Sequence, residues 1–394
     1  MQWASTVSFE SDTGSALQEC CEAISSQLGQ LEPDLVVVFA SSHHDLSQIA
    51  AFPTTQGSFP KAQLFGCSGS GIIGASQEIE SSPALSLTAA VLPGVQITPF
   101  HITSKNLPSP DDPPDAWAAA IGVSLLADAD FLLLADPMST NGEALLAGLD
   151  FAYPSARKVG GLVSGASPRR HAMFLGSETH REGAIGLALS GDIIVDTVVA
   201  QGCRPIGQPM RITGAEHNVL TTVDGIPTLD ALQALYQTLD KRDRGLMERN
   251  LFIGLSMDSI HYEQGVPPFL IRNLIGVDHE RSSIAIGALL QEGQIIQFHV
   301  RDAETSAGDL REALEDYARA PGSKQASGAL LFSCTGRGEY LYGEANHDSR
   351  LFSSLAAGVP LGGFFCNGEI GPVGGITYLH GYTSSFAIFR PKSH

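Results

Sequence analysis

The stretch LGGFFCNGEIGPVGG, residues 361–375, ends an apolar run with six glycines in fifteen residues. Glycine at this density marks a backbone that turns sharply or passes close to another group, because a Cβ atom would clash there. Two other apolar runs also break into glycines: LFGCSGSGIIG from Leu64 and VGGLVSGAS from Val159. The shared pattern predicts that the three segments play the same part in the fold.

An apolar strand precedes each glycine motif by about 30 residues, a spacing typical of a βαβ unit with its crossover helix. These strands are predicted at DLVVVFASS (34–42), DFLLLADPMS (130–139) and GALLFSCTGRG (328–338). A third strand is predicted after each motif, at 84–92, 183–191 and 384–389. The sequence therefore predicts an α/β protein with three related β-α-β-β modules, which form mixed sheets flanked by helices.

The length of 394 residues predicts two domains, because a single hydrophobic core rarely grows to that size. A strand end followed by the start of an amphipathic helix, in TTVDGIPTLDALQALYQTLD (221–240), indicates the boundary. The expected domains are 1–222, with modules at 1–106 and 115–213, and 223–394.

Composition excludes several classes of protein. The chain carries 42 acidic and 23 basic residues, a net charge of −19, which disfavours nucleic acid and anionic lipid as partners. It has no apolar run of 18 residues and no basic, apolar leader, so we expect a cytoplasmic protein without membrane insertion. Its six cysteines form no C-x-x-C pair, which predicts reduced thiols.

Polar side chains follow the predicted strands, where ligands bind in α/β sheets. The third module has the richest set, because Arg337 lies between two glycines and is expected to be exposed and to grip a carboxylate or phosphate. Glu369 could neutralise a ligand ammonium, so the pair suits an amino acid. The predicted ligand-binding residues are Cys334, Thr335, Arg337, Glu344, Asn346, Cys366, Asn367 and Glu369, with a weaker prediction for Cys67, Ser68, Asp136 and Ser164.

Other interpretations of these motifs stay open. The glycines could serve close strand packing, with the cysteines as small core residues. Cys366 or Cys334 could be a nucleophile with His347 and Asp348, although the spacing singles out no catalytic residue. The protein could also be an interaction scaffold without a small ligand.

Cofactors and metals are not expected. The pattern G-x-G-x-x-G at 69–74 follows a predicted strand, but Pro83 leaves no room for the helix that would hold a pyrophosphate. The metal-ligand types in His43-His44-Asp45 and in Glu344-x-x-His347 lack a partner set.

The sequence resembles the FIST family. LIRNLIGVD, QFHVRDAETSAGDL, LLFSCTGRG and LGGFFCNGEIGPVG resemble its C-terminal domain, and FGCSGSGIIG, VGGLVSGAS and GAIGLALSGDIIVDTVVAQGCRPIG resemble its N-terminal domain. The resemblance covers nearly all of the chain and implies a non-enzymatic sensor of small ligands, such as amino acids, that acts in signal transduction with a signalling partner. Ile72 stands where many members have a glutamate, which weakens a ligand role for the first module.

Overall fold

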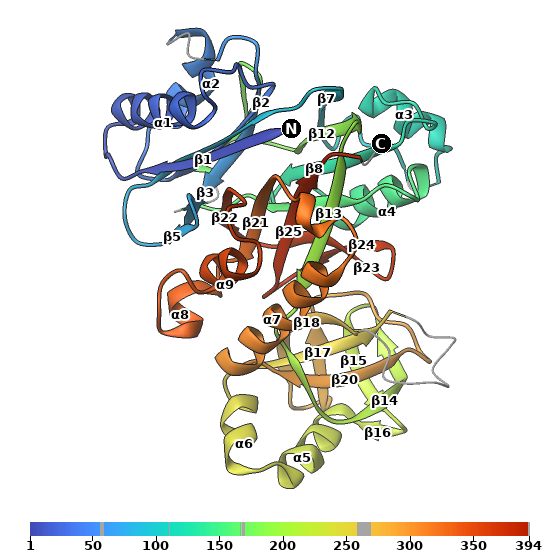
Figure 1. Ribbon diagram of the computed structural model, residues 1–394. Coiled ribbons are helices and arrows are strands. Elements are labelled where there is room, and N and C mark those ends of the chain that lie inside the picture. Colours follow the sequence, from blue (N-terminus) through green and yellow to red (C-terminus); the bar gives the residue numbers. More distant parts are fainter. Residues whose placement is uncertain (56–58, 110, 166, 168–169, 258–268, 393–394) are drawn as a thin grey trace. The chain divides into compact units, whose positions relative to one another are not determined.

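The protein forms two compact units in a computed structural model that describes residues 1–55, 59–109, 111–165, 167, 170–257 and 269–392 (Figure 1). Unit 1 comprises Met1–Ala200 and Leu310–His394, and unit 2 comprises Gln201–Asp309. The boundary predicted at residue 222 falls inside unit 2, so the compact units differ from the predicted domains. Ala166, in the second glycine motif, lies outside the described residues.

Unit 1 contains three six-stranded sheets with one common strand order, so the predicted modules are confirmed. In each sheet the central strand pairs in parallel with the strand of the glycine motif and antiparallel with the predicted third strand. The strands are β2 (Leu35–Ser41), β3 (Gln63–Gly69) and β6 (Leu85–Val91); β8 (Ala129–Ala135), β9 (Lys158–Leu162) and β12 (Ala184–Gly191); and β21 (Gly328–Cys334), β22 (Leu361–Cys366) and β25 (Ser384–Arg390).

Each module begins with a further strand that the sequence analysis did not assign. These strands pair antiparallel with the third strand of their sheet and are β1 (Gln2–Ser8), β7 (Val95–Ile102) and β13 (Ile194–Ala200). Strands β7 and β13 lie inside the ranges predicted for the first and second modules, yet each belongs to the sheet of the next module. The chain then enters unit 2 directly after β13, so unit 2 is an insertion in the third module.

A β-hairpin follows each glycine motif and joins the sheet of another module. Strands β4 and β5 extend the third sheet at β22, β10 and β11 extend the first at β3, and β23 and β24 extend the second at β9. The three exchanges close a ring, so every sheet is completed by a neighbour. The hairpin strands are β4 (Ile72–Gly74), β5 (Gln77–Ile79), β10 (Met173–Leu175), β11 (Glu178–His180), β23 (Glu369–Val373) and β24 (Ile376–His380).

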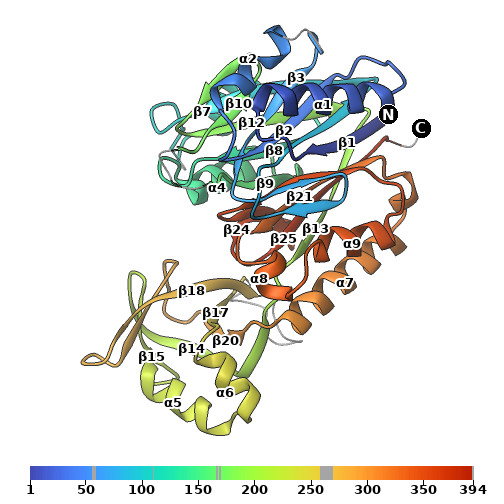
Figure 2. The same cartoon turned by 90° about the vertical axis from the view of Figure 1, so that its left-hand side faces the viewer.

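The three sheets share one core because successive side chains of a strand point to opposite faces. Phe39, Leu134 and Phe332, from the three central strands, lie in a common buried cluster. Their neighbours Val38 and Leu133 face the helices instead. Helices α1 (Thr13–Gln27) and α2 (Ser47–Thr55) pack on the first sheet, α3 (Pro114–Ile121) and α4 (Gly142–Ala152) on the second, and α7 (Ala303–Arg319) and α9 (His347–Leu355) on the third (Figure 2).

Local sequence explains where these helices begin. The side chain of Asp12 accepts a hydrogen bond from the N–H of Ser15 at 2.9 Å and caps α1. Asn141 caps α4 in the same way, through the N–H of Ala144 at 3.1 Å. Unit 1 also contains the short helix α8 (Gly338–Tyr342) and the 3-10 turn Ser323–Gln325.

Unit 2 is a closed antiparallel barrel. Strands β14, β20, β17, β18, β19 and β15 pair in that order, and β15 pairs back to β14. Ile253 and Phe298 lie in its buried core. The strands are β14 (Arg204–Glu216), β15 (Val219–Val223), β16 (Ile226–Pro227), β17 (Leu251–Ser256), β18 (Phe269–Asp278), β19 (Ser283–Ile286) and β20 (Ile295–Val300), and the helices are α5 (Thr228–Thr238) and α6 (Lys241–Met247).

Candidate functional site

The three glycine motifs place a glycine at the same register of each sheet. Gly66, Gly160 and Gly363 lie opposite the middle of the central strand. A Cβ atom on any of them would lie 1.8–2.0 Å from the carbonyl oxygen of the residue opposite, so no other residue type fits. At these positions the glycines serve close strand packing.

The ends of the three motifs meet through hydrogen bonds. The hydroxyl of Ser164 accepts from the N–H of Ser70 at 2.8 Å and donates to the carbonyl oxygen of Phe365. Ser68 Oγ donates to the carbonyl oxygen of Ser164 at 3.0 Å, and Asn367 Nδ2 donates to the backbone of the second motif at 2.9 Å. Three predicted ligand residues thus hold the modules together.

Arg337 is fully buried, so the prediction of an exposed arginine was wrong. Its Nε and Nη2 atoms lie 2.8 and 3.2 Å from the two carboxylate oxygens of Asp348. Burial alone would raise the pKa of Asp348, but Arg337 and hydrogen bonds from His347 and Ser384 hold it below its usual value. The Arg337 guanidinium therefore binds the carboxylate of Asp348, eleven residues further along the same chain.

Glu369 and Cys366 are also buried. Glu369 Oε2 accepts from the N–H of Thr383 at 2.9 Å, and its Oε1 accepts from the Cys366 thiol at 3.3 Å. Burial, followed by the charge of Glu369, raises the pKa of Cys366 well above its ordinary value. A nucleophilic cysteine needs an accessible thiolate, so this environment does not favour cysteine chemistry at Cys366. Cys334 is 8% exposed, and burial alone raises the pKa of Cys67.

The other residues predicted in the third module lie in the loops and helices that follow the same strand end. Thr335 and Glu344 are exposed, and Glu344 pairs with Arg350 at 3.4 Å. Asn346 Oδ1 accepts a hydrogen bond from the N–H of Glu78 at 2.6 Å. The sequence therefore identified neighbours in space, whose polar groups bond largely to their own chain.

Asp136, at the end of β8, holds a histidine that the sequence analysis missed. Its Oδ1 lies 3.0 Å from His171 Nδ1, and both side chains are at most 5% exposed. Its Oδ2 accepts from the hydroxyl of Ser139 at 2.6 Å. The carboxylate thus fixes the orientation of the imidazole.

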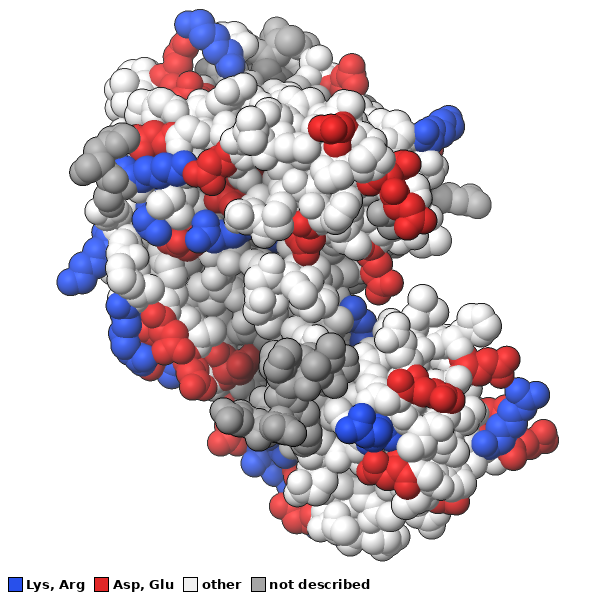
Figure 3. Space-filling view, turned by 90° about the vertical axis from the view of Figure 1, so that its right-hand side faces the viewer, with Lys and Arg blue, Asp and Glu red and all other residues white. Residues whose placement is uncertain are grey.

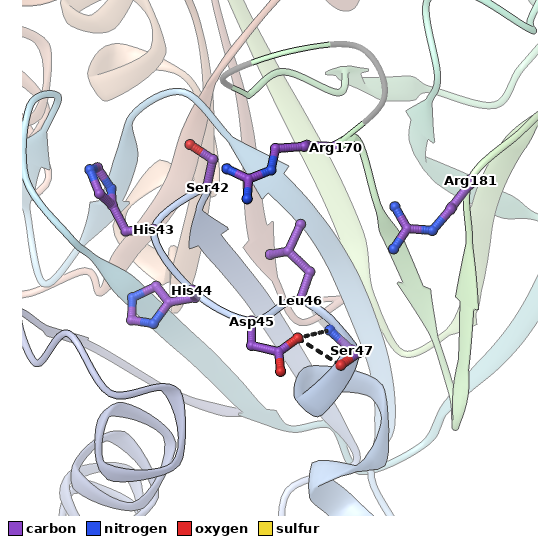
Figure 4. A pocket seen from close by; sticks show the side chains of 8 residues that line it. All are labelled: Ser42, His43, His44, Asp45, Leu46, Ser47, Arg170 and Arg181. Atoms are coloured by element: carbon purple, nitrogen blue, oxygen red, sulfur yellow. Dashed lines mark hydrogen bonds between the residues drawn. The ribbon is translucent and has the colours of Figure 1, made fainter.

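A cavity of about 470 Å³ lies at the carboxyl end of β2, and we call it the basic pocket. The loop 42–47, which joins β2 to α2, forms one side, and Arg170 and Arg181 flank the hairpin β10–β11 on the other side (Figure 4). Two modules form the basic pocket, because the hairpin of the second module pairs with β3 of the first sheet. The lining residues are Ser42, His43, His44, Asp45, Leu46, Ser47, Arg170 and Arg181.

The arginines of the basic pocket are exposed and point toward the loop 42–47 (Figure 4). Arg181 Nη1 donates to the carbonyl oxygen of His171 at 3.3 Å. Neither Arg170 nor Arg181 has an ion pair within the described parts of the chain. In a chain with a net charge of −19, these guanidinium groups give the pocket a local positive charge.

The opposite side of the basic pocket holds an acid and two histidines. Asp45 Oδ1 accepts from the N–H and hydroxyl of Ser47 at 3.1 and 2.6 Å, which caps α2. Burial, followed by the neighbouring His43, lowers the pKa of His44, which favours the neutral imidazole. Among the residues that the structure describes, no group of three metal-ligating side chains occurs, here or elsewhere.

Sequence reasoning missed both arginines, because they are more than a hundred residues from the loop that they face. The rule that ligands bind at strand ends points to Ser42 and its neighbours. The arginine side of the basic pocket gives only a weak signal in the sequence, an Arg-Arg pair at 169–170 in an acidic chain.

Comparison with known families identifies the architecture. Residues 34–226 match the FIST N domain and residues 231–372 match the FIST C domain. The chain belongs to the FIST family. Domains of this family are generally thought to sense small ligands in signalling proteins and are regarded as sensory rather than enzymatic.

Similar FIST proteins occur in mycobacteria. An uncharacterized protein of Mycobacterium tuberculosis is 35% identical over 385 residues, which is 97% of this chain and 98% of that protein. An uncharacterized protein of Mycobacterium bovis is 35% identical over 381 residues, 96% of each chain. An F-box/LRR-repeat protein of Arabidopsis thaliana is 28% identical over 105 residues, 26% of this chain and 20% of that protein.

A solved hydrolase gives a weak structural match to the FIST chain. This structure, of a cyanuric acid hydrolase from A. caulinodans, matches with a TM-score of 0.31 and 9% identity over the full length of both chains. A match at that level carries no argument about fold or function.

No helix in the described ranges is both long and apolar enough to cross a membrane.

Proposed function

We propose that this FIST protein is a sensor that binds a small carboxylate, such as an amino acid, in the basic pocket. The observation that carries the proposal is the pair of guanidinium groups, Arg170 and Arg181, that face the loop 42–47 without an ion-pair partner in the described structure. Arginine binds carboxylates through paired N–H groups, and its planar fork fixes their orientation.

The other side of the pocket suits an ammonium group. Asp45 is exposed, and its Oδ2 accepts one hydrogen bond, from Gln48 Nε2 at 3.0 Å. A carboxylate oxygen has room for a further donor, and an ammonium supplies three. An α-amino acid would thus place its carboxylate near Arg170 and Arg181 and its ammonium near Asp45. The volume of about 470 Å³ lies in the usual range for small-ligand pockets.

We extend the proposal to the cellular role. The FIST protein acts in the cytoplasm, where a signalling protein binds it in its ligand-bound state. Acidic and basic side chains are interspersed on the face in Figure 3, and the described residues form no broad basic surface there. Such a face does not favour nucleic acid as a partner. The net charge of −19 supports the same conclusion.

A thermal-shift screen of amino acids and small carboxylates tests the proposal. A ligand that binds only the folded protein raises the melting temperature. We expect at least one carboxylate to raise it in the wild type, and Arg170→Gln with Arg181→Gln to abolish the shift. Arg319→Gln, which changes an exposed arginine on α7, is the control and should keep it. The proposal fails if no compound stabilises the wild type, or if the double variant responds like the control.

A further inference from the structure

A second cavity, of about 280 Å³, lies at the carboxyl end of β8 in the second module, and we call it the neutral pocket. Like the basic pocket, it lies at the end of a central strand, but it borders the β12 and β7 side of that strand, whereas the basic pocket borders an exchanged hairpin. Residues from the end of β7, the loop after it, the loop between β8 and α4, and the start of β12 line it. All of these segments belong to the second module.

None of the described residues that line the neutral pocket carries a charged side chain. Ile102, Leu107, Pro108 and Ala144 supply apolar surface, and most of the other lining residues carry a hydroxyl or an amide. An ionic ligand would give up its hydration here without gaining an opposite charge, which is costly. The lining thus selects against the anions that the basic pocket attracts.

The hydrogen-bonding groups of the neutral pocket are partly occupied. Ser139 Oγ donates to Asp136 and accepts from the N–H of Gly183 at 2.9 Å, so it has little left to offer. Thr140 Oγ1, in contrast, is buried and has no hydrogen-bond partner in the described part of the chain. A buried hydroxyl without a partner is rare in folded proteins and calls for a group that satisfies it.

We propose that the neutral pocket is a second binding site, for a small uncharged molecule with a short apolar body and one amide or hydroxyl group. The apolar body would contact Ile102 and Leu107. The polar group would pair with Thr140 Oγ1 once a rotation of that side chain turns the buried hydroxyl into the cavity. This inference goes beyond the proposed function, because it needs neither arginine of the basic pocket and concerns a ligand of different charge.

Butyramide and butyrate form a matched pair of probes, because they have nearly the same shape and differ in charge. Saturation-transfer NMR on the full chain measures their binding. We expect butyramide, but not butyrate, to bind at the neutral pocket. Ala144→Leu fills the cavity at little cost in helix propensity and should remove the butyramide signal. Ala147→Leu, at an exposed position of α4 outside the lining, is the matched control.

A second variant keeps the test independent of Ala144→Leu. Thr140→Val preserves the side-chain shape, removes the hydroxyl and should weaken butyramide binding several-fold, with the melting temperature unchanged or raised. The proposal is overturned if the wild type does not bind butyramide, if Ala144→Leu binds it as the control does, or if Thr140→Val binds it with full affinity. Butyrate signals that disappear in the Arg170→Gln, Arg181→Gln variant report on the basic pocket and leave this conclusion intact.

Discussion

The strand ends of the first and third modules start from the same architecture and reach opposite outcomes. In the third, Arg337 lies in the loop after β21 and pairs with Asp348 in α9, which fills the strand end. In the first, the arginines come from another module and form no ion pair with any described residue, which leaves the basic pocket. An arginine is thus available to a ligand only where its own chain supplies no acid.

The exchanged hairpins explain much of this difference. Glu80 follows the hairpin that joins the third sheet, and Arg181 follows the one that joins the first. Glu80 Oε1 accepts from the N–H of Glu339 at 2.8 Å, and a Cβ on Gly338 would lie 2.3 Å from that carboxylate. The hairpin of the first module therefore brings an acid, Glu80, that fills the strand end of the third sheet. The hairpin of the second module brings an exposed base, Arg181, to the strand end of the first sheet.

Breaking the buried pair of the third module should have the largest effect. Asp348→Ala leaves Arg337 charged and unpaired in the core, so we expect a loss of about 3–5 kcal/mol in the free energy of unfolding. Urea denaturation measures it. Arg337→Met combined with Asp348→Leu should recover much of the loss. A cost below about 1 kcal/mol for Asp348→Ala would show that the pair is not sealed from water.

Adding one methyl group at the glycine register should have the next largest effect. Gly363→Ala places a Cβ atom about 2.0 Å from the carbonyl oxygen of Leu331, so the strands must separate. We expect a loss of about 1–3 kcal/mol in stability by urea denaturation. Gly308→Ala, in α7 with open space around it, should be neutral or stabilising. Equal effects of the two changes would contradict the packing role.

The contact of the first module's hairpin with α9 should depend on pH. Glu78 Oε1 accepts from the N–H of Ser349 at 2.6 Å, with Asp348, Glu80, Glu339, Arg337 and His347 as the charged or titratable groups nearby. Burial, followed by the charge of Asp348, raises the pKa of Glu78 from 4.5 to about 7.

A raised pKa means that the folded protein binds this proton more tightly than the unfolded chain. The stability that it contributes is complete below about pH 4.5 and is lost as the pH rises through about 7. We expect Glu78→Gln to remove most of the decline between pH 5 and pH 8, on the order of 1–3 kcal/mol, in denaturation curves. An unchanged decline in Glu78→Gln would assign it to other groups.

Removing the arginines of the basic pocket should have the smallest effect on stability. Arg170→Gln with Arg181→Gln changes exposed side chains without ion pairs in the described structure, so we expect a change within about 0.5 kcal/mol in urea denaturation. A small effect here and a large loss for Asp348→Ala would together show that only the strand end of the third module depends on its charged side chains for stability. A loss above about 2 kcal/mol would mean that these arginines are structural.

The sequence by itself determined the repeated parts of the fold. Apolar runs such as 34–42 predicted the central strands, and the glycines marked the same register in three sheets, because strand burial and backbone contact leave a local trace. It also brought Arg337, Cys366 and Glu369 to one strand end. Their burial could not be predicted, since an arginine between glycines is equally compatible with a ligand and with an internal carboxylate.

Only the tertiary structure decided which segments complete one another. The pairing of β10 with β3, the insertion of unit 2 after β13, and the meeting of Arg181 with the loop 42–47 join residues far apart in the chain. Such pairings depend on the combined free energy of many contacts across the core. No short stretch of sequence contains all the residues that make those contacts. The modules could therefore be predicted from the sequence, but the pockets at their strand ends could not.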